Sequence, residues 1–195
     1  MPHVLSLASK EAPGLRIQMK PLDSTWSDQL DRGEVDIVII PDSFMNPNHP
    51  SERLFEDRYC CVAWKENSEI SESLTIHEYH KLGHVIAQIS EGRTTLFDQW
   101  FLERYGQVRR VEVTSPYFSL LPALIVGTNR IATVHYQLAK IFEHTLPISI
   151  YEVPFDVPPF IETVQYHKHF ESDPVSTWFR GLLHKVASNL TESRH

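Results

Sequence analysis

The chain has 195 residues, 42% of them hydrophobic, and a net charge of −7. This length and composition suit one large or two small folded domains and exclude a disordered chain. No apolar run reaches the roughly 20 residues that a membrane helix needs. The first residues lack a signal-peptide pattern, so we expect a cytoplasmic protein. The acidic charge and dispersed basic residues predict that this chain alone does not bind DNA.

Helical and strand patterns alternate in the first part of the chain. Apolar residues recur near helical spacing before Pro13, and the β-branched run that ends at Pro41 is typical of a strand buried on both faces. The patterns predict helices over 1–12 and 24–33 and strands over 15–22 and 35–41. This order favours parallel α/β structure.

A loop rich in Asn and Pro, 42–52, precedes a second α/β pattern. Strands are predicted over 53–65, 84–89, 108–114, 130–134, 148–154 and 160–168, and helices over 71–82, 94–106, 118–127, 136–144 and 172–188. In the last helix, Asp173 suits the cap and Pro174 the first helical position. The adjacent residues Cys60 and Cys61 are expected to be buried thiols rather than a disulfide.

The patterns divide into two α/β units joined by two strand-like crossings. We expect an outer unit of residues 1–62 and 160–195 and an inserted unit of residues 63–159. Inserted units of this kind leave a cleft, and in open α/β sheets ligands bind outside the carboxyl ends of the strands. The strand ends are therefore the places to look for a ligand site.

One strand end combines aromatic and hydroxyl groups. Tyr117 and Phe118 could stack on an aromatic ligand, and Ser119 with the first helical amides could bind an anionic oxygen. Alternatively, Phe118 is a core residue and Ser115 or Ser119 caps the helix. By the same strand-end rule the other candidates, each alternatively a loop or core residue, are Pro41, Asp42, Ser90, Thr94, Val134, His135, Tyr166 and His167.

Catalytic and metal-binding motifs are not found. The stretch with His77, His80 and His84 is one residue short of the HExxH zinc motif, so surface or cap histidines are the default interpretation. The sequence also lacks the G-x-S-x-G, Walker A and G-x-G-x-x-G patterns. We therefore expect neither an enzyme nor a bound cofactor or metal.

Four collinear segments resemble the effector-binding domain of LysR-type transcriptional regulators. They are "EAPGLRIQM", "LDRGEVDIVIIP", "GTNRIATVH" and "SDPVSTWFRGLL". The details look most similar to the NodD-like and NahR-like branch, which senses aromatic inducers. The resemblance implies two Rossmann-like subdomains of periplasmic-binding-protein-like (type 2) topology, with the first strand of the outer subdomain missing.

The resemblance also implies a function. A small effector, an aromatic acid, phenol or flavonoid-like compound, would bind in the cleft of a homodimer or tetramer. DNA would be bound only through a helix-turn-helix that this chain lacks. The alternative is a free-standing solute-binding protein of the same fold. His135 stands where the family usually has proline, so its titratable ring could alter ligand choice.

Overall fold

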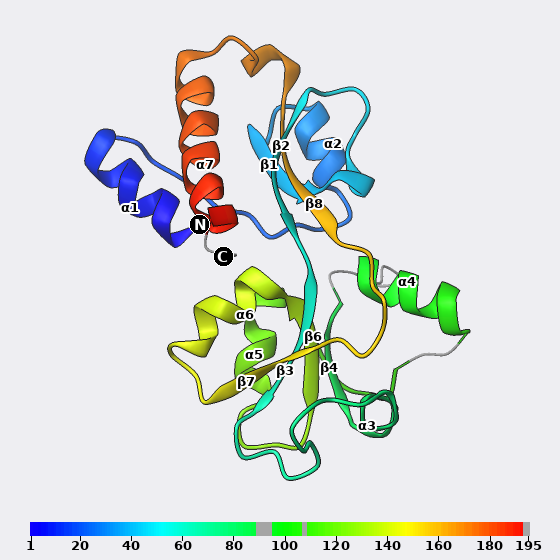
Figure 1. The fold of residues 1–195 in the computed structure, drawn as a ribbon. Helices are drawn as coiled ribbons and strands as arrows, with labels where there is room; N and C mark the ends of the chain where they lie inside the picture. The colour runs from blue at the N-terminus through cyan, green and yellow to red at the C-terminus, as the bar shows by residue number, and fades with distance from the viewer. Residues whose placement is uncertain (89–94, 107–108, 193–195) are drawn as a thin grey trace. The chain divides into compact units, whose positions relative to one another are not determined.

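The computed structural model describes residues 1–88, 95–106 and 109–192, which form two compact units (Figure 1). Unit 1 comprises Met1–Asp57 and Phe160–His195, and unit 2 comprises Arg58–Pro159. The first crossing lies between Asp57 and Arg58 rather than after residue 62. The reason is that hydrogen bonding to the first sheet continues up to Asp57, and the next strand joins the second sheet.

Unit 1 contains a three-stranded sheet in the order β1 (Ile37–Pro41), β8 (Phe160–Tyr166), β2 (Ser51–Asp57). The returning strand β8 runs antiparallel to both neighbours, so the first sheet is not the parallel one that the element order predicts. Pro41 lies opposite Glu162, and Asp57 lies opposite Phe160. The carboxyl ends of β1 and β2 therefore share one edge with the start of β8.

Helices cover both faces of this sheet. On one face, α1 (Pro2–Glu11) and α7 (Pro174–Glu192) pack through Val4, Leu182 and Leu183, which are buried. On the other face, α2 (Trp26–Asp31) packs Leu30 against β1. The carboxylate of Asp173 accepts a hydrogen bond from the Ser176 amide at 2.7 Å, as the predicted helix cap requires.

The strand predicted over 15–22 is wrong. These residues form no strand ladder, and Ile17 and Met19 are exposed. A strand needs a hydrogen-bonded neighbour, and in the part of the chain that the structure describes β1 pairs with β8 alone. The segment has alternating polarity but lies beside no partner strand.

Unit 2 contains a five-stranded sheet in the order β5-β4-β6-β3-β7, in which β3 runs antiparallel to both its neighbours. The strands are β3 (Tyr59–Trp64), β4 (His84–Ala87), β5 (Val111–Ser115), β6 (Ile131–His135) and β7 (Ile148–Glu152). Ala87 pairs with Ser115, and Tyr59 pairs with His135. The carboxyl ends of the parallel strands and the start of β3 thus meet at one edge.

Each face of the second sheet has its own core. The helices are α3 (Ile76–Lys81), α4 (Leu96–Tyr105), α5 (Leu121–Leu124) and α6 (Tyr136–Glu143). Cys60 faces the core beneath α5 and α6, and Cys61 faces the core beneath α3 and α4. Both are free buried thiols, as predicted, and burial raises the pKa of Cys61 to about 12.

The helix predicted over 118–127 is much shorter in the structure. A 3-10 turn, η2 (Phe118–Leu120), leads into the single turn of α5, with Pro122 in its first positions. The chain then turns at Gly127, whose φ of +76° suits a residue without a side chain. So short a helix has little macrodipole, which weakens the attraction of an anion to its first amides.

Candidate functional site

The strand-end edge of unit 2 carries a cluster of rings. The His135 ring lies 4.5 Å from the Phe118 ring and 5.6 Å from the Tyr59 ring, measured between centroids. The Tyr59 ring in turn lies 5.2 Å from the Phe97 ring of α4. These distances are typical of tilted aromatic contacts. We call Tyr59, Phe97, Phe118 and His135 the aromatic edge.

His135 is uncharged at neutral pH. Burial lowers its pKa to about 4, because the imidazolium form loses its hydration among apolar neighbours. The residue also begins α6, since His135 occupies the N-cap position of that helix. The aromatic edge therefore presents the half-buried, neutral rings of Tyr59, Phe118 and His135, with the buried Phe97 ring packed behind Tyr59.

The turn after β5 is fixed by Ser115 rather than by Ser119. The Ser115 hydroxyl accepts a hydrogen bond from the Tyr117 amide at 3.1 Å and donates to the Tyr117 carbonyl oxygen at 3.2 Å. Tyr117 is 55% exposed, Ser119 is exposed and Phe118 is half-buried. The turn therefore leaves Tyr117 and Ser119 accessible while Phe118 joins the cluster.

The strand-end edge of unit 1 is acidic. Asp42 follows β1, Asp57 ends β2, and Glu162 lies opposite Pro41 near the start of β8. Burial, with the nearby charges of Asp57 and then Asp42, raises the pKa of Glu162 to about 7. We call Asp42, Asp57 and Glu162 the acidic edge. Both crossing segments leave unit 1 here, since Asp57 and Phe160 flank them in the chain.

Tyr166 and His167 lie at the other end of the same sheet. Tyr166 is opposite Ile37, the first residue of β1, about 13 Å along the strand from Pro41 at roughly 3.3 Å per residue. The strand-end rule misplaces them because β8 is antiparallel to β1. Tyr166 is buried under the Arg180 guanidinium, whose carbon lies 3.8 Å from the ring centroid.

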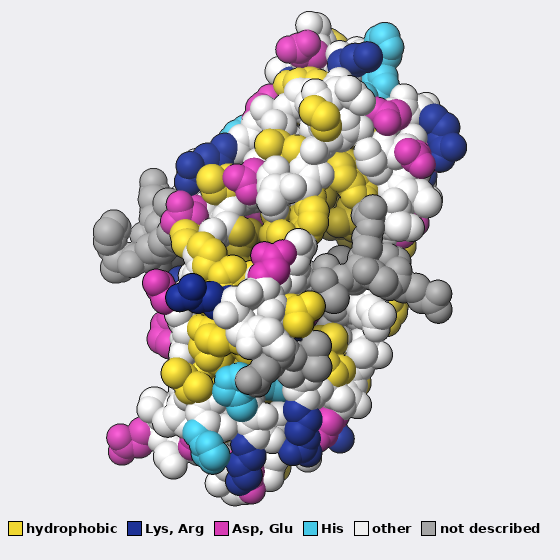
Figure 2. All heavy atoms as spheres, turned by 90° about the vertical axis from the view of Figure 1, so that its right-hand side faces the viewer, with side chains coloured by type: hydrophobic (Ala, Val, Ile, Leu, Met, Phe, Trp, Pro, Cys, Tyr) yellow, Lys and Arg dark blue, Asp and Glu magenta, His cyan; other side chains and the backbone are white. Residues whose placement is uncertain are grey.

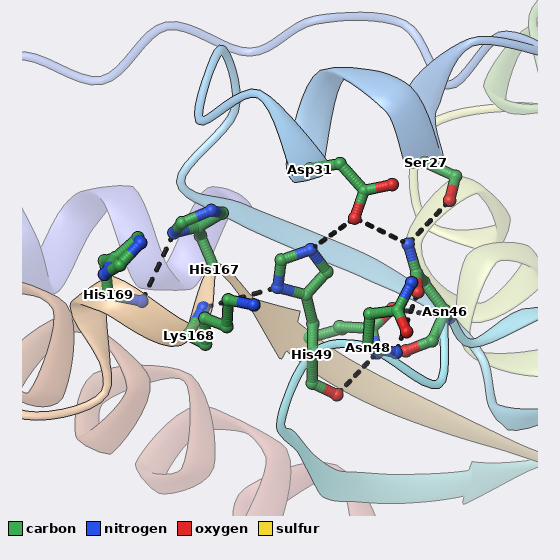
Figure 3. A network of polar contacts seen from close by, with 9 residues as sticks. Ser27, Asp31, Asn46, Asn48, His49, His167, Lys168 and His169 are labelled. Atoms are coloured by element: carbon green, nitrogen blue, oxygen red, sulfur yellow. Dashed lines mark hydrogen bonds and ion pairs between the residues drawn. The ribbon is translucent and has the colours of Figure 1, made fainter.

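His167 belongs to a polar network that fixes the loop before β2 (Figure 3). His49 Nδ1 accepts a hydrogen bond from the Lys168 amide at 3.3 Å, so its Nε2 carries the proton and donates to Asp31 at 2.8 Å. The His49 and His167 rings lie 4.9 Å apart, and His167 Nδ1 accepts from the His169 amide at 3.2 Å. These contacts bind the loop to α2 and to η3 (Lys168–Phe170).

The remaining predicted residues divide three ways. Val134 is fully buried in the core beneath α5 and α6, so it is not available at the edge. Pro41 and Asp42 lie at the edge of unit 1, where β1 passes into η1 (Asp42–Phe44). Ser90 and Thr94 lie outside the described residues.

Three features of the two edges are missed by the sequence reasoning. Tyr59 is missed because the strand-end rule considers only the carboxyl ends of strands, whereas Tyr59 lies at the amino end of β3. Glu162 could have been found as the one charge within the apolar strand "FIETVQY". Phe44 and Met45, which follow Asp42 and are 41% and 37% exposed, could have been found as apolar residues in a polar loop.

A hollow of about 400 Å³ lies at the opposite end of unit 2, beside the starts of β4, β5 and β6. Its charged side chains are paired with one another. Glu112 accepts from Arg110 at 2.5 Å and from Arg130 at 2.8 Å, and Lys81 pairs with Glu69 at 2.7 Å. It offers no aromatic wall among the described residues, so we place the candidate site at the aromatic edge instead.

Charged side chains form no patch of a single sign on the face that Figure 2 shows, because basic and acidic side chains are interspersed there. Within the described residues, no helix is both long and apolar enough to cross a membrane.

Comparison with known proteins agrees with the fold. Residues 1–188 match the family model of the LysR substrate-binding domain. Nodulation protein D 1 from Rhizobium tropici is 41% identical over 190 residues, covering 97% of this chain and 62% of that protein. The chain thus spans about three fifths of the length of this relative.

Solved structures share the architecture. The regulatory domain of MexT, a transcriptional activator in Pseudomonas aeruginosa, matches with a TM-score of 0.79 and 20% identity, covering 95% of this chain and 90% of that chain. The reduced OxyR regulatory domain from Pseudomonas aeruginosa matches with a TM-score of 0.72 and 14% identity over 94% of this chain and 89% of that one. These likenesses support the expected mixed α/β, periplasmic-binding-protein-like topology. The chain belongs to the LysR substrate-binding domain family, the regulatory part of LysR-type transcription regulators.

Proposed function

We propose that the chain is the effector-sensing and oligomerising part of a transcription factor, and that it binds a small aromatic effector at the aromatic edge. The contacts of His135 with Tyr59 and Phe118 are the observation that carries this proposal. Flat neutral rings bind aromatic compounds through stacking and apolar burial. The exposed Tyr117 and Ser119 border the same site from the turn after β5.

The effector that we propose is uncharged and carries hydroxyl groups. The rings of the aromatic edge are neutral, because burial lowers the pKa of His135 to about 4. The exposed side chains of Tyr117 and Ser119 carry hydroxyl groups that can hydrogen-bond to a phenolic hydroxyl. Arg58, which precedes Tyr59 in the chain, pairs with Glu152 at 2.7 Å, so its charge is already balanced. A phenol or flavonoid-like compound therefore fits the aromatic edge better than an aromatic acid.

Regulation would follow from differential binding. An effector shifts an equilibrium between arrangements of subdomains or subunits only if it binds one arrangement more tightly. In a homodimer or tetramer, such a shift would change how attached helix-turn-helix domains sit on DNA. The relatives' greater length is consistent with such an attached domain.

A thermal-shift screen tests the ligand class. The panel is flavonoids, salicylate and aliphatic acids, each added to the 195-residue chain. Because ligand bound to the folded state raises the melting temperature, we expect flavonoids to stabilise most, salicylate less and aliphatic acids not at all. Stabilisation by aliphatic acids alone would contradict an aromatic effector. The coding sequence upstream separates a regulator, with a helix-turn-helix, from a solute-binding protein with a signal peptide.

A further inference from the structure

A chain of buried polar groups lies directly beneath the aromatic edge. Tyr59 pairs with His135, and two residues further into the sheet Cys61 pairs with Thr133 on the same face. The Thr133 hydroxyl lies 3.0 Å from Tyr79 Oη and 3.7 Å from Cys61 Sγ. Tyr79 is fully buried. Beneath the aromatic edge, β6 and α3 are therefore joined by a hydrogen bond between the hydroxyl groups of Thr133 and Tyr79.

Arg109 connects this layer to the first turn of α4. Its side chain is only 3% exposed and donates to Asp98 Oδ1 through Nε, at 2.9 Å, and through Nη2. The guanidinium also lies close enough to the Tyr79 side chain to interact with it electrostatically, which completes the connection. Asp98 in turn accepts from the hydroxyl of the cap residue Thr95 at 2.7 Å, so the ion pair is built into the start of the helix.

The same turn of α4 also reaches the aromatic edge. Phe97 precedes Asp98, and its ring lies 5.0 Å from the Arg109 guanidinium carbon and 5.2 Å from the Tyr59 ring. Because Phe97 and Asp98 are adjacent in α4, a shift of Asp98 away from Arg109 would also shift the Phe97 ring relative to the Tyr59 ring. Because Phe97 is buried, it acts as the support of the Tyr59 ring, and the position of that support depends on the salt bridge between Arg109 and Asp98.

Stability alone is a weak explanation for this ion pair. Burying an arginine and a carboxylate costs desolvation energy that their attraction often only balances. Arg109 Nη1 is buried and has no hydrogen-bond partner among the described residues. In some proteins, buried polar groups of this kind fix one arrangement among several.

We propose that Arg109 is a positioning residue for the effector site. It holds the first turn of α4 in one register against Tyr79 and Thr133, and thereby fixes Phe97 beside Tyr59. Where it concerns ligand binding, this inference rests on the function proposed above. Arg109 itself touches no ligand.

Two variants and a matched control separate positioning from stability. Arg109→Lys keeps the charge but loses the planar fork, and Tyr79→Phe removes one hydroxyl. Arg180→Lys is the control, because Arg180 is also buried, pairs with Glu52 at 2.9 Å and lies over a ring, but in unit 1. The probe is whichever of salicylate or the flavonoids binds the unsubstituted chain.

We expect Arg109→Lys to raise the Kd of the probe about tenfold, equivalent to about 1.4 kcal/mol. Arg180→Lys, at a comparable loss of melting temperature, is expected to change the Kd by less than about twofold, because the contacts of Arg180 with Glu52 and Tyr166 lie within unit 1. Tyr79→Phe should also weaken binding. Equal losses of affinity in the Arg109 and Arg180 variants, or none in either, would overturn the proposal.

Hydrogen exchange tests the positioning without a ligand. The amides of Asp98 and Gln99, which donate to the side chain and the carbonyl oxygen of Thr95, should exchange faster in Arg109→Lys than in Arg180→Lys, while those of α6 keep their protection. Unchanged exchange in the first turn of α4 would contradict the proposal, even if no aromatic compound bound. A failed ligand screen with faster exchange would instead overturn only the proposed ligand class.

Discussion

Among the single residues of the two edges, burial decides the charge states. His135 stays neutral because its pKa falls to about 4, and Glu162 stays partly protonated near neutral pH because its pKa rises to about 7. Neither shift is predictable from the sequence, since both depend on neighbours that the fold brings together. The sequence does predict that the histidine at position 135 lies at the end of a strand.

Glu162 should make the unfolding free energy depend on pH. Its pKa is about 7 in the folded chain against an ordinary 4.5, so the folded state holds its proton more tightly. This contribution to stability is complete below pH 4.5 and is lost as the pH rises through about 7. Glu162→Gln should remove this pH dependence, and urea unfolding at about pH 5 and about pH 8 would measure the change.

The difference between the variant and the unsubstituted chain is the quantity to compare. His84 and His135, with pKa values lowered to about 3 and about 4, act in the opposite direction as the pH falls below 6.5. Both histidines are present in the variant and in the unsubstituted chain, so their contributions cancel in the difference between the two unfolding free energies. Glu103→Gln, at an exposed position on α4, serves as the control. The same pH profile for Glu162→Gln and Glu103→Gln would refute the role of Glu162.

Phe118 should contribute most among the residues of the turn after β5. Its ring lies 4.5 Å from His135, whereas Tyr117 is 55% exposed. Phe118→Ala should weaken binding of an aromatic probe by about tenfold, because it removes a stacking wall, and Tyr117→Ala with Ser119→Ala should weaken it less. Titration calorimetry would measure this, with the exposed Ile141→Ala of α6 as control. No loss of affinity in any of these turn variants would disprove the assignment of this turn.

Among the helices and strands, sequence patterns predict an element well where its partners are near or its caps explicit. The long helix α7 shows both, with Asp173 at its cap and apolar residues at helical spacing. The segment 15–22 shows the limit, because alternating polarity cannot supply a neighbouring strand. Strand direction, too, is set by long-range pairing, which is why the strand-end rule places Tyr166 at the wrong end of the sheet.

Two glycine substitutions should act in opposite directions. Gly181 is exposed in the middle of α7, with open space where an added Cβ would lie, so Gly181→Ala should stabilise the fold by about 0.5–1 kcal/mol. At Gly83 an added Cβ would come within 2.3 Å of the Glu112 carboxyl carbon. Glu112 would then have to leave Arg110 and Arg130, but its carboxylate is the end of a flexible side chain in partly exposed ion pairs. Gly83→Ala should therefore lose less than about 1 kcal/mol of stability. Chemical denaturation measures both, and a gain in both would contradict the described packing.

For the whole molecule, the sequence predicts two units because helical and strand patterns alternate twice and the crossings separate them. Each unit has its own apolar cores, around Leu182 and Val164 in unit 1 and around Val62 and Tyr79 in unit 2. The structure divides the chain into two such units, Met1–Asp57 with Phe160–His195 and Arg58–Pro159. The sequence could not reveal which ends of the strands carry accessible groups, since that depends on pairing across the chain.

The most direct test of the central claim is chemical-shift mapping by NMR on the 195-residue chain, titrated with a hydroxylated flavonoid. The aromatic effector site that we propose predicts that the largest shift changes occur at Tyr59, Phe118 and His135. Changes gathered instead around Arg110 and Arg130, beside the hollow at the opposite end of unit 2, would contradict it.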